Sequence, residues 1–466
     1  MASTAPSTSA TPVEVPPRPE PVATRLPPGP RAPALVQTLA WALAPTWVMA
    51  RCAKQLGDAF TLTFFPSGMQ LAVVSDPEAV KTVFTAPPEV APSGTGNSPV
   101  APIVGSSSVL VLTGPEHIRQ RKLLLPPFHG ERMREYEDVI AEATRRDMAG
   151  WPLGRSMRVL ARSRAITLEV ILRAVFGVEA ERMARLRAAI AGLLEPANTL
   201  AVLIFALSRP RPGRPTGGVG RALDRLDAVI YEELARRREQ QDLAERTDIL
   251  SLLLQARDED GRPMTDEELR DELVTLLLAG HETTATSVAW AIERLVRHPE
   301  KLRRLVAEID AEAEGGPSEY MTAVVNETLR VRPVVPIVVR VLQEELSVGG
   351  YNLPAGTRVT PSIYLTNRNP KVYEDPEEFR PERFLDGGPE TFSWIPFGGG
   401  IRRCIGASFA QLEMGVILRT ILSELEPQLP QKARRWRRGE WTRRRAVTLV
   451  PAGGARVVWR SRRVGD

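Results

Sequence analysis

Apolar residues at helical spacing dominate the chain from about residue 34 onward, and strand-like alternation is confined to short runs. The strand signals lie at 59–65, 70–75, 358–365, 446–450 and 455–459. No repeat of fixed period is visible. The pattern predicts a mainly α protein with small β-sheets, an α+β fold.

The longest helical pattern begins after Thr265 and stops before Pro299. Thr265 and Glu268 have the spacing of a capping box. About 33 residues at about 1.5 Å each make a rod of roughly 50 Å, long enough to cross a whole domain. Its apolar centre, 276–279, is followed by Gly-His-Glu-Thr-Thr at 280–284. These residues either bend a core helix through threonine–backbone hydrogen bonds or open it to present an acid and a hydroxyl.

Irregular sequence interrupts the helical patterns. Residues 1–33 are rich in proline and cannot bury a core, which predicts a disordered tail. The stretches 85–108 and 208–220 are long for loops, and ordered loops of that length often form lids or binding sites. The helical pattern 32–50 is broken or bent at Pro45 and is too polar to span a membrane. We expect a single domain over 34–466, since no linker is evident.

Composition narrows the functional classes. The chain has 43% hydrophobic and 25% charged residues, as soluble globular proteins do, and a net charge of +5. Two cysteines exclude a disulfide framework and fit the cytoplasm, and four histidines argue against a multi-histidine metal site. No secretory signal opens the chain. The basic run 432–445 is interpreted as solvated surface rather than a nucleic-acid or lipid patch.

Two sets of charged residues have helical spacing. Glu327 and Arg330 share one helix face, and Arg383 is a possible third member of a buried ion-pair network. His117 and Arg121 lie one turn apart on one face, which suits an anionic ligand. A solvated basic face would give the same spacing.

Cys404 stands between a glycine-rich run and an apolar helical pattern, in Trp-Ile-Pro-Phe-Gly-Gly-Gly-Ile-Arg-Arg-Cys-Ile-Gly at 394–406. A thiol at a helix N-terminus is favoured as the thiolate. The glycines 398–400 let the backbone approach a flat object, and Phe397 offers an aromatic face to it. Arg402 can pair with a carboxylate in two-point fashion. A thiolate, a flat apolar partner and paired carboxylates together describe haem on its thiolate side.

The run 397–406 resembles the haem-binding signature of the cytochrome P450 family. Ala-Gly-His-Glu-Thr-Thr at 279–284 resembles that family's oxygen-activation motif, Glu-Thr-Leu-Arg at 327–330 its Glu-x-x-Arg, and Pro-Glu-Arg-Phe at 381–384 the arginine that completes that triad. The motifs occur in the family's order, and the start of the chain is similar to soluble bacterial members. The resemblance implies the P450 fold, with the long central helix over a buried haem.

It also implies roles for individual residues. Cys404 would be the axial ligand of haem b (iron protoporphyrin IX), and Glu282 and Thr283 would relay protons to dioxygen. The other expected haem contacts are His117, Arg121, Ala279, Gly280, Arg340, Phe397, Gly398, Arg402 and Gly406, of which His117, Arg121, Arg340 and Arg402 would pair with the propionates. Glu327, Arg330 and Arg383 would be structural.

The implied reaction is monooxygenation, with one oxygen atom of O2 inserted into a substrate. Electrons would come from NAD(P)H through a separate ferredoxin and ferredoxin reductase, and an acidic partner would suit a basic surface near Cys404. Three alternatives remain: a peroxygenase, which would not need Glu282 and Thr283; an isomerase or dehydratase, which would need no electrons; and a non-catalytic haem sensor.

Apolar residues predict a lipophilic substrate, with fatty acids first and terpenoids or steroids next. The candidate pocket residues are Val100, Ile103, Val104, Ile204, Leu276, Val335, Ile337 and Val338. Simple packing under a lid would explain the loop residues equally well. We expect a cytoplasmic monomer without nucleic acid or a membrane span.

Overall fold

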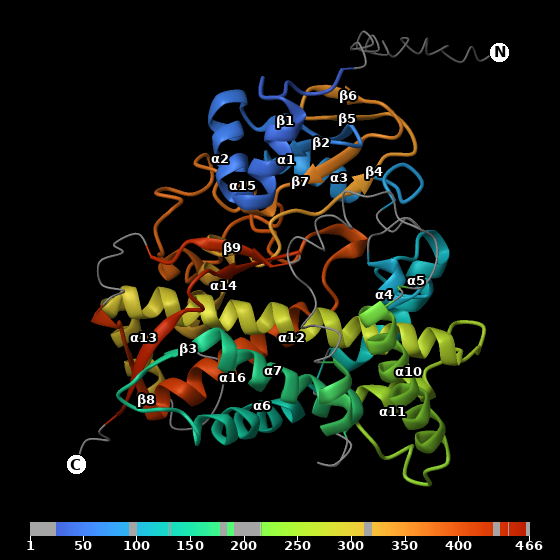
Figure 1. Ribbon diagram of the computed structural model, residues 1–466, viewed down its shortest axis with the longest axis vertical. Coiled ribbons are helices and arrows are strands. Elements are labelled where there is room, and N and C mark those ends of the chain that lie inside the picture. The colour runs from blue at the N-terminus through green and yellow to red at the C-terminus, as the bar shows by residue number, and fades with distance from the viewer. Residues whose placement is uncertain are drawn as a thin grey trace, which may run out of the picture.

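A sheet-containing part packs on a larger helical part, and the longest helix crosses the helical part (Figure 1). The structure is a computed structural model that describes residues 25–92, 100–128, 130, 132–177, 184–190, 215, 217–311, 319–431, 439–445 and 447–462. The predicted predominance of helices over small sheets is confirmed.

The α-helices are α1 (Ala34–Leu43), α2 (Pro45–Leu56), α3 (Pro77–Thr85), α4 (Ala101–Val104), α5 (Gly114–Leu124), α6 (Arg132–Met148), α7 (Val159–Phe176), α10 (Gly217–Arg238), α11 (Ile249–Gln255), α12 (Asp266–Arg297), α13 (Pro299–Ala311), α14 (Glu319–Val331), α15 (Ile363–Thr366) and α16 (Ala407–Glu424). Short 3-10 turns lie at η1 (Pro126–Phe128), η2 (Pro381–Phe384) and η3 (Gly400–Arg402).

Four small sheets complete the described chain. Their strands are β1 (Ala59–Phe64), β2 (Met69–Val74), β3 (Ser156–Arg158), β4 (Arg340–Val341), β5 (Leu346–Val348), β6 (Tyr351–Leu353), β7 (Arg358–Pro361), β8 (Leu425–Gln428), β9 (Thr442–Arg445), β10 (Thr448–Pro451) and β11 (Arg456–Ser461). The largest sheet has the order β1-β2-β7-β4, and its β2–β7 pair is parallel, with Leu71 opposite Arg358. This pairing joins the start of the chain to the segment after α14.

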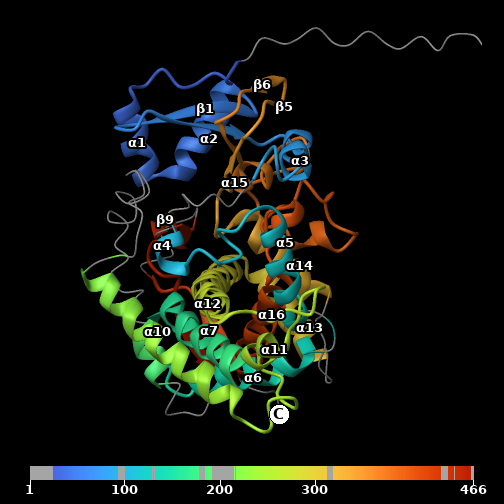
Figure 2. The same ribbon diagram turned by 90° about the vertical axis from the view of Figure 1, so that its right-hand side faces the viewer.

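Helix α12 runs through the middle of the helical part, with α7 and α16 beside it (Figures 1 and 2). The predicted capping box is present: the Thr265 hydroxyl accepts the Glu268 N–H at 3.2 Å, and the Glu268 carboxylate accepts the Thr265 N–H at 2.7 Å. The helix is continuous through 280–284. The Thr283 and Thr284 hydroxyls donate to the carbonyls of Ala279 and Gly280, at 2.7 and 3.1 Å. Of the two alternatives, an opened helix is therefore not what this structure has.

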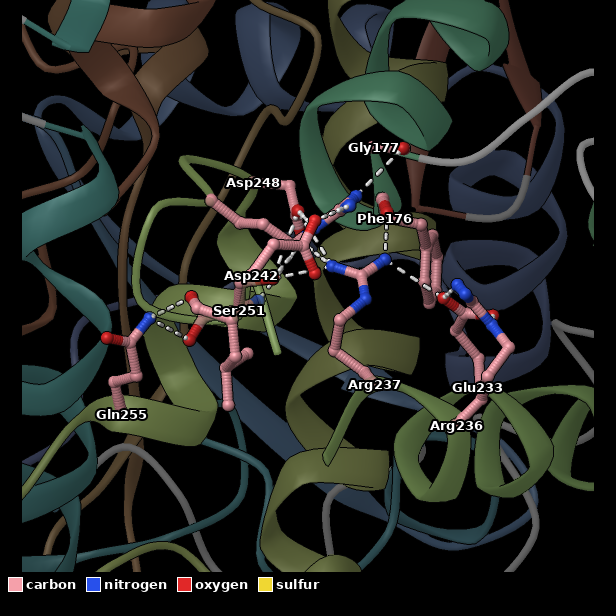
Figure 3. A network of polar contacts seen from close by, with 11 residues as sticks. Phe176, Gly177, Glu233, Arg236, Arg237, Asp242, Asp248, Ser251 and Gln255 are labelled. Carbon is pink, nitrogen blue, oxygen red and sulfur yellow. Dashed lines mark hydrogen bonds and ion pairs between the residues drawn. The ribbon is translucent and has the colours of Figure 1, made fainter. Parts of the chain in front are cut away.

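A buried arginine holds together the ends of α7, α10 and α11 (Figure 3). The Arg237 guanidinium is fully buried and donates to Asp248 at 2.5 Å, to Glu233 at 2.9 Å and to the Phe176 carbonyl at 2.6 Å. Asp248 also caps α11 by accepting the Ser251 N–H. These bonds fix the C-terminal end of α10 and the N-terminal end of α11 against the C-terminal end of α7.

Some predicted boundaries are confirmed and others differ. As predicted, Pro45 divides the first helical pattern, into α1 and α2. The strand signal at 358–365 ends at Pro361, because Ser362 caps α15 instead. Within the expected tail, residues 1–24 lie outside the described chain. Residues 25–33 are attached to the sheet, because Thr61 of β1 donates its hydroxyl to the Pro27 carbonyl and its N–H to the Pro28 carbonyl.

Two expected loops contain helices. Helix α4 lies inside 85–108, and α10 begins at Gly217, while 93–99 and 208–214 fall outside the described chain. In the part of the chain that the structure describes, no helix combines the length and apolar character needed to cross a bilayer.

Candidate functional site

Cys404 lies in the loop between η3 and α16, and Gly406 is the N-cap of that helix. The Cys404 N–H donates to the Phe397 carbonyl at 2.9 Å, which closes the loop. The predicted approach of the glycines to a flat object is only part of their use. A β-carbon at Gly400, whose φ is +64°, would lie 2.1 Å from the Phe84 carbonyl oxygen, so this glycine lets the loop press against α3.

The pKa of the Cys404 thiol departs from the sequence expectation. Burial raises it, while the Gly406 N–H, Arg403 and Arg121 act in the opposite direction and are outweighed. The side chain is nevertheless accessible. The protein atoms around the sulfur still raise its pKa, because they disfavour the charged form. The protein alone therefore does not generate a thiolate here, whereas a coordinating metal deprotonates a thiol outright.

Four basic side chains gather near this loop, from α5, β4 and η3. His117 and Arg340 are buried, and Arg402 and Arg121 are partly so. Burial, with the charges of Arg402, Arg121 and Arg340, lowers the pKa of His117 to about 4, so the imidazole is neutral. Burial alone lowers the pKa of Arg340 to about 10, and burial with Arg340 and Arg121 lowers that of Arg402 to about 10. The cluster thus raises the cost of its own positive charge.

No carboxylate of the described residues forms an ion pair with Arg121, Arg340 or Arg402. Arg402 donates to the carbonyls of Val109, at 2.7 Å, and Leu112. Neither ring nitrogen of His117 has a hydrogen-bond partner in the described chain. A buried cation without a partner is costly, and bidentate binding of a carboxylate removes that cost. The residues present therefore fit a ligand with carboxylates, as haem is.

Three of the residues predicted to contact haem, His117, Arg340 and Arg402, line one hollow. It is lined by Val83, Phe84, Ala86, Pro88, Ala91, Pro92, Thr113, Gly114, His117, Arg340, Ile401 and Arg402. The Arg340 guanidinium also lies 5.7 Å from the centroid of the Phe84 ring. None of the predicted substrate-pocket residues lines this hollow.

One face of α12 is accessible although the helix lies inside the molecule. Ala279 is exposed and Leu276, Gly280 and Thr283 are half-buried, while Leu277 and Thr284 are buried. Positions i, i+3, i+4 and i+7 share a helix face. The residues predicted to border haem on α12 thus lie together, on the side of the helix that contains its accessible residues.

Glu282 lies off this face and is paired with arginine. Its carboxylate accepts from Arg164 of α7 at 2.6 Å and lies 3.9 Å from Arg445 of β9. His281, which had no predicted role, is buried, and its Nδ1 lies 3.0 Å from the Leu277 carbonyl. A proton relay through Glu282 therefore has to pass through an ion pair.

The predicted triad is assembled. Glu327 and Arg330 are fully buried and joined by two bonds of 2.6 and 2.8 Å, and Arg383 lies 3.6 Å from Glu327. Arg330 also donates to the carbonyls of Asn367, Pro376 and Glu378. The triad ties α14 to the segment that leads to the cysteine loop.

The substrate-pocket residues are spread over several elements. Ile103 and Val104 lie on α4, which Val100 precedes as the N-cap. Ile103 packs against the main core, and Val104 is buried. Ile337 packs toward the cluster around Trp41 and Phe60, and Val338 toward Ile363 and Ile395. Val335 is half-buried, and Ile204 lies outside the described residues. The structure leaves their convergence on one pocket a prediction.

Sequence reasoning missed three buried polar side chains. Both amide atoms of Gln120, on α5, lack a partner in the described chain. Glu272 and Glu413 are buried acids, whose pKa burial raises to about 8 in each case. For Glu413 the sequence signal is an acidic residue within a mostly apolar helical stretch, whereas Glu272 stands among other charged residues and gives no such signal.

Comparisons with known proteins agree with this geometry. The sequence model of the family described as Cytochrome P450 matches residues 27–454. A Mycobacterium tuberculosis protein named cytochrome P450 135B1 is 43% identical over 443 residues, which cover 94% of this chain and 92% of that protein. Another protein of the same species, named cytochrome P450 137, is 42% identical over 426 residues, which cover 89% of this chain and 86% of that protein.

Two solved structures share the fold. Cyanobacterial CYP120A1 with bound retinoic acid superposes with a TM-score of 0.80 at 24% identity, over 94% of this chain and all of that one. The heme domain of cytochrome P450DA gives a TM-score of 0.81 at 22% identity, over 94% and 98%. Sequence and fold together show that the chain belongs to the cytochrome P450 family of haem-dependent monooxygenases.

Proposed function

We propose that this chain oxidises a lipophilic substrate, with Cys404 as the thiolate that would hold haem b and with electrons from NAD(P)H through a ferredoxin and its reductase. The observation that carries the haem assignment is the group of His117, Arg121, Arg340 and Arg402, which has no carboxylate partner in the described chain. Haem, when bound, activates dioxygen and inserts one oxygen atom into the substrate.

The chain's own residues would hold the haem and supply protons. Arg402 and Arg340 would bind its carboxylates, and Phe397, Gly398 and Gly406 would form the loop around Cys404. Residues of the accessible face of α12 would also border the haem. The Thr283 hydroxyl, 2.7 Å from the Ala279 carbonyl, would pass a proton taken from Glu282. In this structure the Glu282 carboxylate is paired with Arg164.

The surface near Cys404 supports docking of an acidic electron donor. Arg403 and Ile401 are exposed beside it, and Ile118 is exposed on α5. Basic and apolar side chains in one patch suit a transient interface with an acidic protein. Both cysteines are free thiols, which agrees with a cytoplasmic location.

Replacement of Cys404 tests the ligand assignment. In the Cys404→Ser variant, the reduced carbon-monoxide complex should lose the red-shifted Soret band that a thiolate ligand gives. A spectrum identical to that of the parent would exclude Cys404 as the ligand.

An optical titration of the ferric protein tests the substrate class. The panel consists of long-chain fatty acids, terpenoids including retinoic acid, and steroids. A low-to-high spin shift with one class would identify the family of substrates, and turnover that depends on NAD(P)H and ferredoxin would distinguish a monooxygenase from an isomerase. A shift with none of them would contradict the lipophilic assignment.

A further inference from the structure

The segment Gly105–Leu112, which joins α4 to α5, is bonded along one side to α12. The Ser107 N–H donates to Asp271 Oδ2 at 2.9 Å, and the Val109 N–H donates to Glu272 Oε1 at 2.7 Å. Both carboxyl groups are buried. Buried carboxyl groups that bind main-chain N–H groups fix the path of the segment, because neither partner can turn to water instead.

Side-chain contacts strengthen this attachment. The Ser108 and Thr275 hydroxyls lie 2.7 Å apart, and both residues are buried. Gly105 has a φ of +94°, and a β-carbon there would lie 2.0 Å from the Asp271 carboxyl group. The segment therefore lies directly on α12, with no room for a side chain at its first residue.

The other side of the same segment is bonded to Arg402, two residues before Cys404. Arg402 Nη1 donates to the Val109 carbonyl at 2.7 Å, and Nη2 donates to the Leu112 carbonyl. Val109 is thus held through its N–H by Glu272 and holds Arg402 through its carbonyl. A guanidinium has five N–H donors, so these two bonds leave donors for an anionic ligand.

Glu272 is suited to a fixed, uncharged contact. Burial, with a smaller contribution from the charges of Asp271 and Glu268, raises its pKa to about 8, while the Val109 N–H acts in the opposite direction. Its second oxygen, Oε2, has no hydrogen-bond partner in the described chain. A neutral glutamic acid has nearly the shape and hydrogen bonding of glutamine, which supplies a conservative replacement.

We propose that Glu272 is a positioning residue for the cofactor: by holding the Val109 N–H, it fixes the carbonyl that orients the Arg402 guanidinium. This inference rests on the proposed role of Arg402 in binding a haem carboxylate. Groups that orient a ligand-binding side chain without touching the ligand commonly govern how firmly the ligand is held. Glu272 does so from α12, across the Gly105–Leu112 segment.

The test uses full-length ferric holoprotein of the parent and of two variants at position 272. Haem transfer to an excess of a haem-scavenging apoglobin, and the haem reduction potential, are measured for the parent, Glu272→Gln and Glu272→Leu. Glu272→Leu should lose haem about tenfold faster, in the range found for groups behind a metal or cofactor ligand. Its potential should fall, since a mobile Arg402 contributes less positive charge. Glu272→Gln should restore both values toward the parent.

A matched control separates positioning from general destabilisation. Glu293 is another buried acid of α12 that accepts a main-chain N–H, from Glu440 at 2.8 Å. Glu293→Gln should lower the free energy of unfolding without faster haem loss. If Glu272→Leu does not fold, Glu272→Asp replaces it, because a side chain shorter by one methylene no longer reaches the Val109 N–H.

Each outcome decides the proposal. Folded Glu272→Leu or Glu272→Asp protein with the haem loss and potential of the parent would overturn it, as would Glu272→Gln protein that behaves like Glu272→Leu. A parent protein without the thiolate-type carbon-monoxide spectrum would instead refute the proposed function on which the inference depends.

Discussion

Single residues carry the strongest argument for a bound cofactor. Many arginines of the described chain pair with acids, as Arg237 does with Asp248 and Arg330 with Glu327. Arg340 and Arg402 instead bond to carbonyl groups and repel each other. Without a carboxylate partner, these guanidinium groups lower the stability of the folded protein. A ligand with carboxylates would restore that stability.

Gly400 and Gly398 provide a matched pair for testing the cysteine loop. Both have positive φ, +64° and +69°, but only Gly400 lies against the Phe84 carbonyl. Gly398→Ala should cost about 1 kcal/mol, the cost of a left-handed conformation. Gly400→Ala adds a clash with main chain, so a loss of about 3 kcal/mol and reduced haem content are expected. Urea unfolding and the haem-to-protein ratio measure both; equal effects would contradict the contact with α3.

Thr283 should control how electrons are used. Thr283→Ala removes the hydroxyl that would pass protons on the accessible face of α12. The fraction of NAD(P)H diverted to hydrogen peroxide should rise about tenfold, within the usual effect of a proton-transfer group. Ser287→Ala, one turn further along and hydrogen-bonded to the Thr283 carbonyl, serves as the control. Coupling as tight as in the parent would remove Thr283 from the proton path.

At the scale of elements, the helices are joined by few buried ionic contacts at defined corners. The network of Arg237 fixes α10 and α11 against the end of α7 (Figure 3). The triad of Glu327, Arg330 and Arg383 does the same for α14 and η2. Such contacts favour one arrangement because breaking either partner leaves a buried charge.

Arg237→Met should therefore destabilise the protein by about 3 kcal/mol, since it leaves the buried carboxylates of Glu233 and Asp248 with fewer partners. The neighbouring Arg236 also pairs with Glu233 but is partly exposed, with 29% of its side chain accessible. Arg236→Met should cost under about 1 kcal/mol. Denaturant unfolding of both variants gives the comparison, and similar losses would mean that burial of Arg237 is not what matters.

At the scale of the whole molecule, α12 is a central element, which packs against α7, α10, α14 and α16. The α16 helix that packs on α12 contains Glu413, whose side chain is buried and whose pKa is influenced by Thr284 of α12. Helix α16 begins just after the cysteine loop, so Glu413 lies on the helix that connects this loop to α12.

Glu413 makes the stability of the molecule depend on pH. Burial raises its pKa from 4.5 to about 8, against a smaller opposing effect of Thr284. The folded state then binds the proton more tightly than the unfolded state, so the contribution to stability is complete below about pH 4.5 and is lost as pH rises through about 8. The free energy of unfolding should fall over this window in the parent, and the fall should be smaller in Glu413→Gln.

The control for this titration is the exposed Glu426, which follows the same helix. Glu426→Gln should leave the pH dependence of the parent in place. Parent and Glu413→Gln curves that run parallel from pH 5 to 8 would show that Glu413 is not the responsible group.

The sequence by itself determined the fold class, the long helix with its capping box, and the residues of the cysteine loop and triad. These are local patterns, in which spacing, capping chemistry and glycine positions act between near neighbours along the chain. Motif resemblance added the haem and the monooxygenase reaction, and both agree with the family shown by the comparisons.

Only the tertiary structure decided which polar groups are buried together. Residues far apart in sequence meet in three places. Glu282 pairs with Arg164, and Gly400 lies against the Phe84 carbonyl. Val109 links Glu272 to Arg402. The expected lowering of the Cys404 pKa was wrong for the same reason, because burial outweighs the helix terminus. Desolvation depends on what packs around a group, and no local pattern contains that information.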